Sequence, residues 1–132
     1  MASARAVNAG ARAAQISGFV GSLQEPRTPY ISPTRFSKAL GVSPSAMARF
    51  TGVHRNTMRN PASERVQERL REIIRVILAA TELTGDLTKA IFWFRNEPIA
   101  NYQHKTAAEL VAKGHAEAVL AYLRDLENGA NG

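Results

Sequence analysis

The sequence predicts an all-α protein, because its apolar residues recur at three- and four-residue intervals between helix-start and helix-stop residues. No stretch has the pattern of a β-strand. The 132 residues, 45% of them hydrophobic, suffice for one domain or for two very small domains that share a core. No apolar run approaches the roughly 18 residues of a transmembrane helix, so no membrane partner is expected.

Basic residues are concentrated in the first half of the chain. Residues 1–62 carry eight Lys or Arg and one acid, whereas residues 63–132 carry nine bases and ten acids. A basic half joined to a neutral half indicates a module that faces a polyanion, followed by a module of another kind. A solvated basic surface with no ligand explains the same charges.

Residues 1–33 are assigned to a flexible or basic N-terminal arm and linker. Residues 1–16 are alanine-rich with two arginines and no acid, and they fit a basic arm, a fraying helix or disorder; a transit peptide also fits this composition. Residues 17–33 contain three prolines and two glycines, which predicts a loop or linker.

Residues 34–83 are predicted to form a helix-turn-helix DNA-binding domain and a long helix that follows it. Short helices are expected at residues 35–40, 43–50 and 55–60, with Gly41 and Gly52 at the breaks. Two short helices joined by a turn with glycine are typical of the helix-turn-helix motif, although a plain helical bundle has the same pattern. The predicted small core consists of Leu40, Val42, Met47, Phe50, Val53 and Met58.

The third short helix is mostly polar, as a recognition helix in the major groove must be. Its guanidinium, amide and hydroxyl groups suit guanine, adenine and phosphate. The predicted DNA-contacting residues are Ser43, Ser45, His54, Arg55, Asn56, Thr57, Arg59 and Asn60.

The longest helix is predicted over residues 64–83, with Asn60 or Ser63 as its cap. One stripe is apolar and is expected in the core: Val66, Leu70, Ile73, Ile74, Ile77 and Leu78. The opposite face mixes both charges and is interpreted as solvated surface, with a nucleic-acid face as the alternative: Arg65, Glu68, Arg69, Arg71, Glu72 and Arg75. Gly85 and Asp86 end this helix and begin the next.

Residues 84–132 are predicted to form a small helical region. A helix with the aromatic cluster 91–94, whose Trp93 is expected in the core, breaks at Pro98. Thr106 and Glu109 form a capping box that starts a short helix, which stops at Gly114. The last helix carries Val119, Leu120, Leu123 and Leu126 at helical spacing and is expected to end at Asn128-Gly129.

This region resembles the toxin-binding part of the Xre/MbcA/ParS group of antitoxins, and residues 48–60 resemble the Xre-type DNA-binding domain. The resemblance covers roughly residues 33–129. In the C-terminal region it rests on Ala90, Trp93, Asn96, Pro98, Thr106, Glu109, Leu110, Gly114, Val119, Leu123, Glu127 and Gly129. The family often has Gly-x-Thr-Pro where this chain has residues 104–107, His-Lys-Thr-Ala, so the turn before Thr106 must be built differently here.

The resemblance implies a cytoplasmic bacterial type II antitoxin that covers the active site of a RES-domain toxin, an enzyme that consumes NAD or transfers ADP-ribose from it. It further implies binding to operator DNA, and we expect a homodimer. The alternatives are a stand-alone helix-turn-helix transcriptional regulator whose C-terminal helices dimerise, and an adaptor that binds another protein but not DNA.

The toxin contact is predicted on the irregular segment after residue 95 and on the end of the last helix, because loops on rigid supports commonly carry binding function. Tyr102 either meets the partner or folds back onto the helices. The predicted contacts are Asn96, Pro98, Asn101, Tyr102, Gln103, Lys105, Thr106, Arg124, Glu127, Asn128 and Gly129.

The sequence has no pattern of catalytic residues or metal ligands. Cysteine is absent and the three histidines are scattered, so no metal site is expected. No signature joins a nucleophile to a base, and no glycine-rich phosphate loop follows a strand. We therefore expect neither catalysis nor a cofactor.

Overall fold

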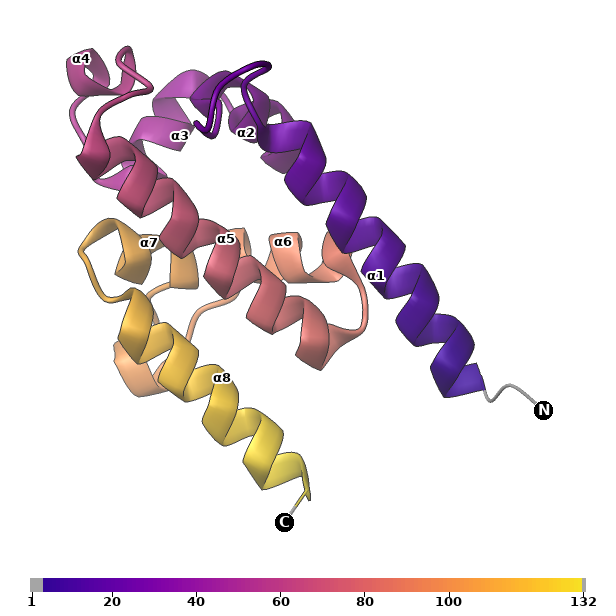
Figure 1. Ribbon diagram of the computed structural model, residues 1–132. Coiled ribbons are helices and arrows are strands. Elements are labelled where there is room, and N and C mark those ends of the chain that lie inside the picture. The colour runs from indigo at the N-terminus through magenta and orange to yellow at the C-terminus, as the bar shows by residue number, and fades with distance from the viewer. Residues whose placement is uncertain (1–3, 132) are drawn as a thin grey trace.

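The computed structural model describes residues 4–131, and it is helical with no β-strand in that range, as predicted (Figure 1). The elements in order are α1 (Ala4–Leu23), α2 (Pro33–Leu40), α3 (Pro44–Thr51), α4 (Arg55–Met58), α5 (Glu64–Thr84), α6 (Leu87–Asn96), the 3-10 helix η1 (Ala100–Tyr102), α7 (Ala107–Ala112) and α8 (Ala116–Asn131). None of these helices is both long and apolar enough to cross a membrane.

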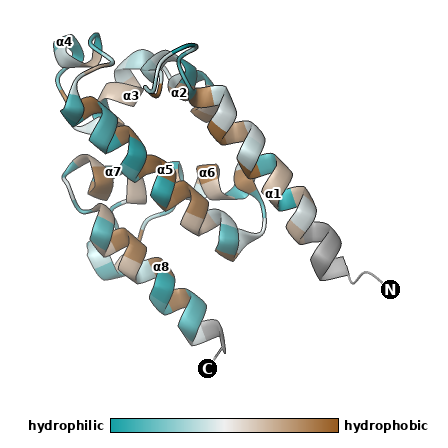
Figure 2. Ribbon diagram, in the orientation of Figure 1, coloured by the Kyte–Doolittle hydropathy of each residue, from teal (hydrophilic) through white to brown (hydrophobic). Residues whose placement is uncertain are grey.

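Helix α5 lies at the centre of the molecule, with α1 and α8 on either side of it in Figure 1. It packs against α3, α6, α7 and α8. The predicted apolar stripe is confirmed at Val66, Leu70, Ile73 and Ile77, which are fully buried, whereas the other two members are half-buried. In Figure 2, α5 and α8 each carry hydrophobic and hydrophilic stripes along their length.

Side-chain caps set the starts of most helices at the predicted places. The hydroxyl of Ser43 accepts a hydrogen bond from Ala46 N at the start of α3. The hydroxyl of Ser63 accepts one from Val66 N at the start of α5. Ser63 is therefore the cap of α5, whereas Asn60 Oδ1 accepts a hydrogen bond from Ala62 N. Asp86 caps α6, and the predicted capping box at the start of α7 is present.

The prediction of a loop at residues 17–33 is wrong for residues 17–23, which lie in α1. Phe19 and Leu23 are buried at helical spacing, and the Phe19 ring meets the edge of Phe36 with a centroid distance of 6.1 Å. This tertiary packing outweighs the roughly 1 kcal/mol that each glycine costs in a helix. Farther along α1, the Gln15 side chain accepts a hydrogen bond from Leu87 N.

The segment between α1 and α2 is held by the buried side chain of Gln67. Its carboxamide oxygen accepts from Ile31 N at 2.9 Å, and its nitrogen donates to Ile31 O at 2.9 Å and Pro61 O at 2.8 Å. One amide thus satisfies three backbone groups of two connecting segments. A polar residue in the core is stable here because its hydrogen-bonding groups have partners.

The prediction that the last helix ends at Asn128-Gly129 is also wrong, because α8 continues to Asn131. Residues 124–129 are exposed, and Leu126, predicted on the buried stripe, is 44% exposed. The end of α8 is therefore held by its own backbone hydrogen bonds. Within a helix a single glycine costs only about 1 kcal/mol, which is too little to enforce an end.

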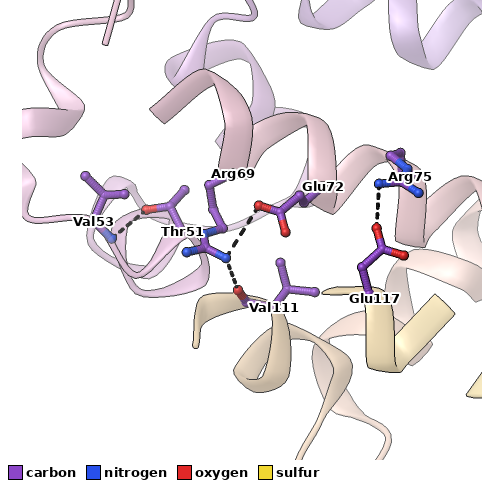
Figure 3. Close-up of polar contacts among 7 residues, drawn as sticks. All are labelled: Thr51, Val53, Arg69, Glu72, Arg75, Val111 and Glu117. Carbon is purple, nitrogen blue, oxygen red and sulfur yellow. Dashed lines mark hydrogen bonds and ion pairs between the residues drawn. The ribbon is translucent and has the colours of Figure 1, made fainter. Parts of the chain in front are cut away.

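Polar contacts from α5 to α7 and α8 join residues that are 42 positions apart in the sequence. Arg69, predicted on a solvated face, is half-buried and donates to Val111 O at 2.7 Å while it lies 3.5 Å from the carboxylate of Glu72 (Figure 3). Arg75 pairs with Glu117 at 3.0 Å, as Figure 3 shows. The solvated interpretation of the charged face of α5 is therefore wrong at Arg69 and Glu72.

Gly52, between α3 and α4, lies directly against the backbone of α7. It has a φ of 68°, and a Cβ atom added there would collide with the carbonyl oxygen of Ala112. Glycine is thus required both by the backbone conformation and by the close approach of α7.

We predict that Gly52→Ala destabilises the protein by about 2–4 kcal/mol, because it combines a left-handed backbone with a collision against main-chain atoms. Urea denaturation followed by circular dichroism measures the change. Gly18→Ala is the control, since its Cβ meets nothing within 4 Å inside α1, and it should add about 0.5–1 kcal/mol. Equal stability of the two variants would contradict the close approach.

Candidate functional site

Six of the predicted DNA-contacting residues lie on or beside α4, at one end of the molecule (Figure 1), whereas Ser43 and Ser45 lie at the start of α3. Arg55, Asn56, Arg59 and Asn60 are all exposed, so their polar groups face solvent. Helix α4 is shorter than predicted and buries none of its residues fully. It is held by Met58, whose sulfur accepts from the buried Thr51 hydroxyl at 3.4 Å.

Four of the predicted DNA contacts have structural roles or restricted access. His54 caps α4, and its Nδ1 atom accepts from Asn56 N at 3.2 Å. Ser43 is exposed, but its hydroxyl caps α3. Ser45 and Thr57 are half-buried. The groups that remain free for a ligand are mainly the two guanidinium groups, the Asn56 amide and the amide nitrogen of Asn60, whose oxygen accepts from Ala62 N.

A pocket of about 200 Å³ lies between α2, α3 and α4. Arg55 and Arg59 stand at its edge, and Met47 and Met58 form part of its floor. The cluster of two arginines beside a hollow suits an anion such as a backbone phosphate.

The segment after α6 forms a tight, hydrogen-bonded loop. Ile99 is buried; its amide donates to Lys105 O at 2.9 Å, and its carbonyl accepts from His104 N at 3.0 Å. Gln103 and His104 both adopt left-handed backbone conformations, with φ of 59° and 61°. Two consecutive left-handed residues without glycine make the turn before Thr106, at a cost of about 1–2 kcal/mol each.

Tyr102 folds back onto the helices, the second of the two arrangements considered for it. Its ring meets the edge of Tyr122 on α8 at a centroid distance of 6.3 Å, and its hydroxyl donates to Ala118 O at 3.4 Å. Trp93, expected in the core, is half-buried on α6. Tyr102 thus anchors the loop to α8.

The other predicted toxin contacts are mostly exposed. Asn101 and Gln103 are exposed and line a pocket of about 330 Å³ with Lys105 and His115, whereas Lys105 and Thr106 are half-buried. Asn96 and Pro98 are exposed, and the amide of Asn96 donates to Phe92 O. Four further predicted contacts are exposed on the last turns of α8: Arg124, Glu127, Asn128 and Gly129.

The loop and the end of α8 adjoin each other. Because the loop packs against Ala118 and Tyr122, it lies within about one helical turn of Arg124. The structure therefore brings together two segments that were predicted separately.

Sequence reasoning missed a further hollow of about 280 Å³ between α3, α6 and α7. Arg49, Arg95 and Lys113 line it together with Phe50. These residues come from three separate elements, and no spacing in the sequence marks them as neighbours.

In the range that the structure describes, no three His, Asp or Glu side chains lie close enough together to hold a metal ion. No family model matches the chain, and no curated protein or solved structure matches it either.

We predict that Tyr102→Ala lowers the free energy of unfolding by about 2 kcal/mol, because it removes a half-buried aromatic contact and a hydrogen bond. Tyr102→Phe keeps the ring and should cost less than about 1 kcal/mol. Thermal denaturation of both variants measures the difference. If Tyr102→Ala is as stable as the wild type, the loop is not anchored on Tyr122.

Proposed function

We propose that this chain is a type II antitoxin that binds operator DNA through the α4 region and neutralises a RES-domain toxin through the loop after α6 and the end of α8. The observation that carries the proposal is the placement of these two polar surfaces on separate parts of one rigid helical core. The resemblance to the Xre/MbcA/ParS antitoxins supplies the identity of the toxin.

The DNA-binding part of the proposal is supported by α2, α3 and α4. Two short helices end in left-handed glycines, Gly41 and Gly52, and the polar α4 follows with its side chains exposed. The predicted core of this unit is buried at Leu40, Met47 and Val53 and half-buried at its other three members. Helices joined by a glycine turn and carrying an exposed polar helix suit the helix-turn-helix assignment.

Neutralisation works by occlusion. The loop is fixed by Ile99 and Tyr102, so its exposed side chains at residues 101 and 103 are presented with little loss of conformational entropy. The last turns of α8 project beyond the core and can enter a cleft of a partner. A RES-domain toxin covered in this way cannot admit NAD.

A stand-alone transcriptional regulator is the second candidate, because two large apolar side chains are exposed on the C-terminal helices. Phe92 on α6 is 62% exposed and Leu126 on α8 is 44% exposed. Side chains of this kind suit contact with a second copy of the chain. In that case the C-terminal helices dimerise and no toxin is involved.

We predict that Arg55→Ala with Arg59→Ala weakens binding to the DNA upstream of its own reading frame by about 1–3 kcal/mol for each arginine that contacts a base. Gel-shift titration at fixed salt measures the affinity. The matched control is Arg71→Ala with Lys89→Ala, which removes two exposed cations from α5 and α6. Equal losses in both double variants would mean that net charge, rather than α4, determines binding.

We predict that truncation after Leu123 abolishes protection against a RES-domain toxin encoded beside this chain, because it removes the projecting turns of α8 and leaves the buried Leu123 in place. Growth and cellular NAD during co-expression are the readouts, and circular dichroism verifies that the remaining helices fold. Glu68→Ala with Arg71→Ala, two exposed changes on α5, serves as the control. Full protection by the truncated chain would remove the tail from the proposed contact.

A further inference from the structure

A second basic surface lies on α3, α6 and α7. Arg49, Arg95 and Lys113 surround a hollow of about 280 Å³ whose walls include Phe50 and Ala112. We call this hollow the basic groove. Arg95 is fixed in position because its Nη1 atom donates to Leu40 O at 3.2 Å, and the remaining N–H groups of its guanidinium are available to a ligand.

The cations of the basic groove have no acidic partner within the described part of the chain. The ion pairs there join Arg12 to Glu82, Arg69 to Glu72 and Arg75 to Glu117, and none includes a groove residue. The one carboxylate at the rim, Glu109, accepts from Thr106 N and Oγ1 at 3.3 and 3.2 Å in the capping box. The groove thus carries a net positive charge, with three cations against one carboxylate.

A fourth cation extends this positive surface. The side chain of Lys105 lies against that of Lys113, and the hydrogen bond and the charge of Lys113 lower the pKa of Lys105. Two adjacent ammonium groups repel each other, and an anion placed between them relieves that repulsion.

The basic groove faces away from the α4 surface. Met47 and Ala48 of α3 line the hollow beside α4, whereas Arg49 and Phe50 line the basic groove. Successive residues of a helix are turned by about 100°, so these two pairs lie on opposite sides of α3. DNA bound at α4 therefore leaves the basic groove free for another ligand.

The lining of the groove favours a peptide over a phosphate chain. Phe50 is half-buried, with its ring against the edge of Phe94 at a centroid distance of 5.9 Å, and Ala108 and Ala112 complete an apolar floor. Such a floor suits an apolar side chain, and a densely charged phosphate would gain nothing from it.

We propose that the basic groove binds an acidic segment of a protein partner, with carboxylates on Arg49, Arg95 and Lys113 and an intervening apolar side chain on Phe50. Lys105 and Thr106, two of the predicted toxin contacts, adjoin the groove. The segment therefore belongs to the toxin, and this step rests on the proposed function.

The first test measures binding of a fluorescent nine-residue peptide, three repeats of Glu-Phe-Glu, to the full chain by anisotropy. Arg49→Glu with Lys113→Glu should weaken binding by about tenfold or more, because two attractive contacts become repulsive. Both side chains are exposed, and neither belongs to an ion pair of the described residues. The control, Arg71→Glu with Lys89→Glu, makes the same change of net charge elsewhere and should change the affinity less than about twofold.

Equal losses in the two double variants, or no binding by the wild type, would overturn the proposal. The same variants are titrated with a 20-base-pair duplex of random sequence. If the duplex loses affinity in the groove variant as strongly as the peptide does, the groove is a nucleic-acid surface and the proposal is wrong.

The second test asks whether the toxin supplies the acidic segment. The groove variant should lose protection during co-expression with the RES-domain toxin, and the control variant should keep it. If the groove variant loses its affinity for the peptide but still protects cells from the toxin, the toxin does not use the groove, and the antitoxin function itself stands. If even the wild type gives no protection, the proposed function fails, and the peptide titration still decides whether the groove binds acidic segments.

Discussion

The burial of α5 is the constraint on which the rest of the structure depends. Its buried surface is wider than one stripe, since Val76, Ala80 and Thr81 are buried as well as four of the predicted residues. Each large side chain contributes about 1.5–3 kcal/mol when it is removed from water. One partner helix cannot cover such a surface, so α6, α7 and α8 pack around α5 together with α3. The connections between these helices are thereby fixed in place. Two of these connections carry polar surfaces: the α4 region, between α3 and α5, and the loop after α6.

Local signals in the sequence were sufficient to place most helices. Ser43, Asp86 and Thr106 mark helix starts because each side chain accepts a backbone hydrogen bond that the helix itself cannot supply. The wrong predictions concern residues whose conformation or burial is determined by contacts with distant parts of the chain. Residues 17–23 are helical because Phe19 packs on Phe36, and Arg69 is half-buried because it meets Val111, which is 42 residues away in the chain. Pairings of this kind leave no periodic mark in the sequence.

The candidate binding surfaces were likewise predictable where local sequence determines them and unpredictable where distant contacts do. The exposure of the polar α4 residues followed from their composition, and the projecting end of α8 followed partly from its polar sequence. The anchoring of Tyr102 on Tyr122 was only one of two arrangements that the sequence allowed. The left-handed pair at residues 103 and 104 was not foreseen, because neither residue is a glycine. The basic groove could not be predicted at all, since it exists only where α3, α6 and α7 meet.

Gln67 has a consequence for tracing the ancestry of this fold. Its side chain both donates to and accepts from Ile31 and also reaches Pro61, and among uncharged side chains only glutamine has this length with both kinds of group. Glutamate lacks the donors, and asparagine is one methylene too short. Gly52, fifteen residues earlier, and Arg69, two residues later, are restricted by their own contacts with α7. Glycine, glutamine and arginine at this spacing make a physically founded search pattern for divergent homologues. The surfaces of such homologues are free to change, whereas the contacts made by these three residues must persist.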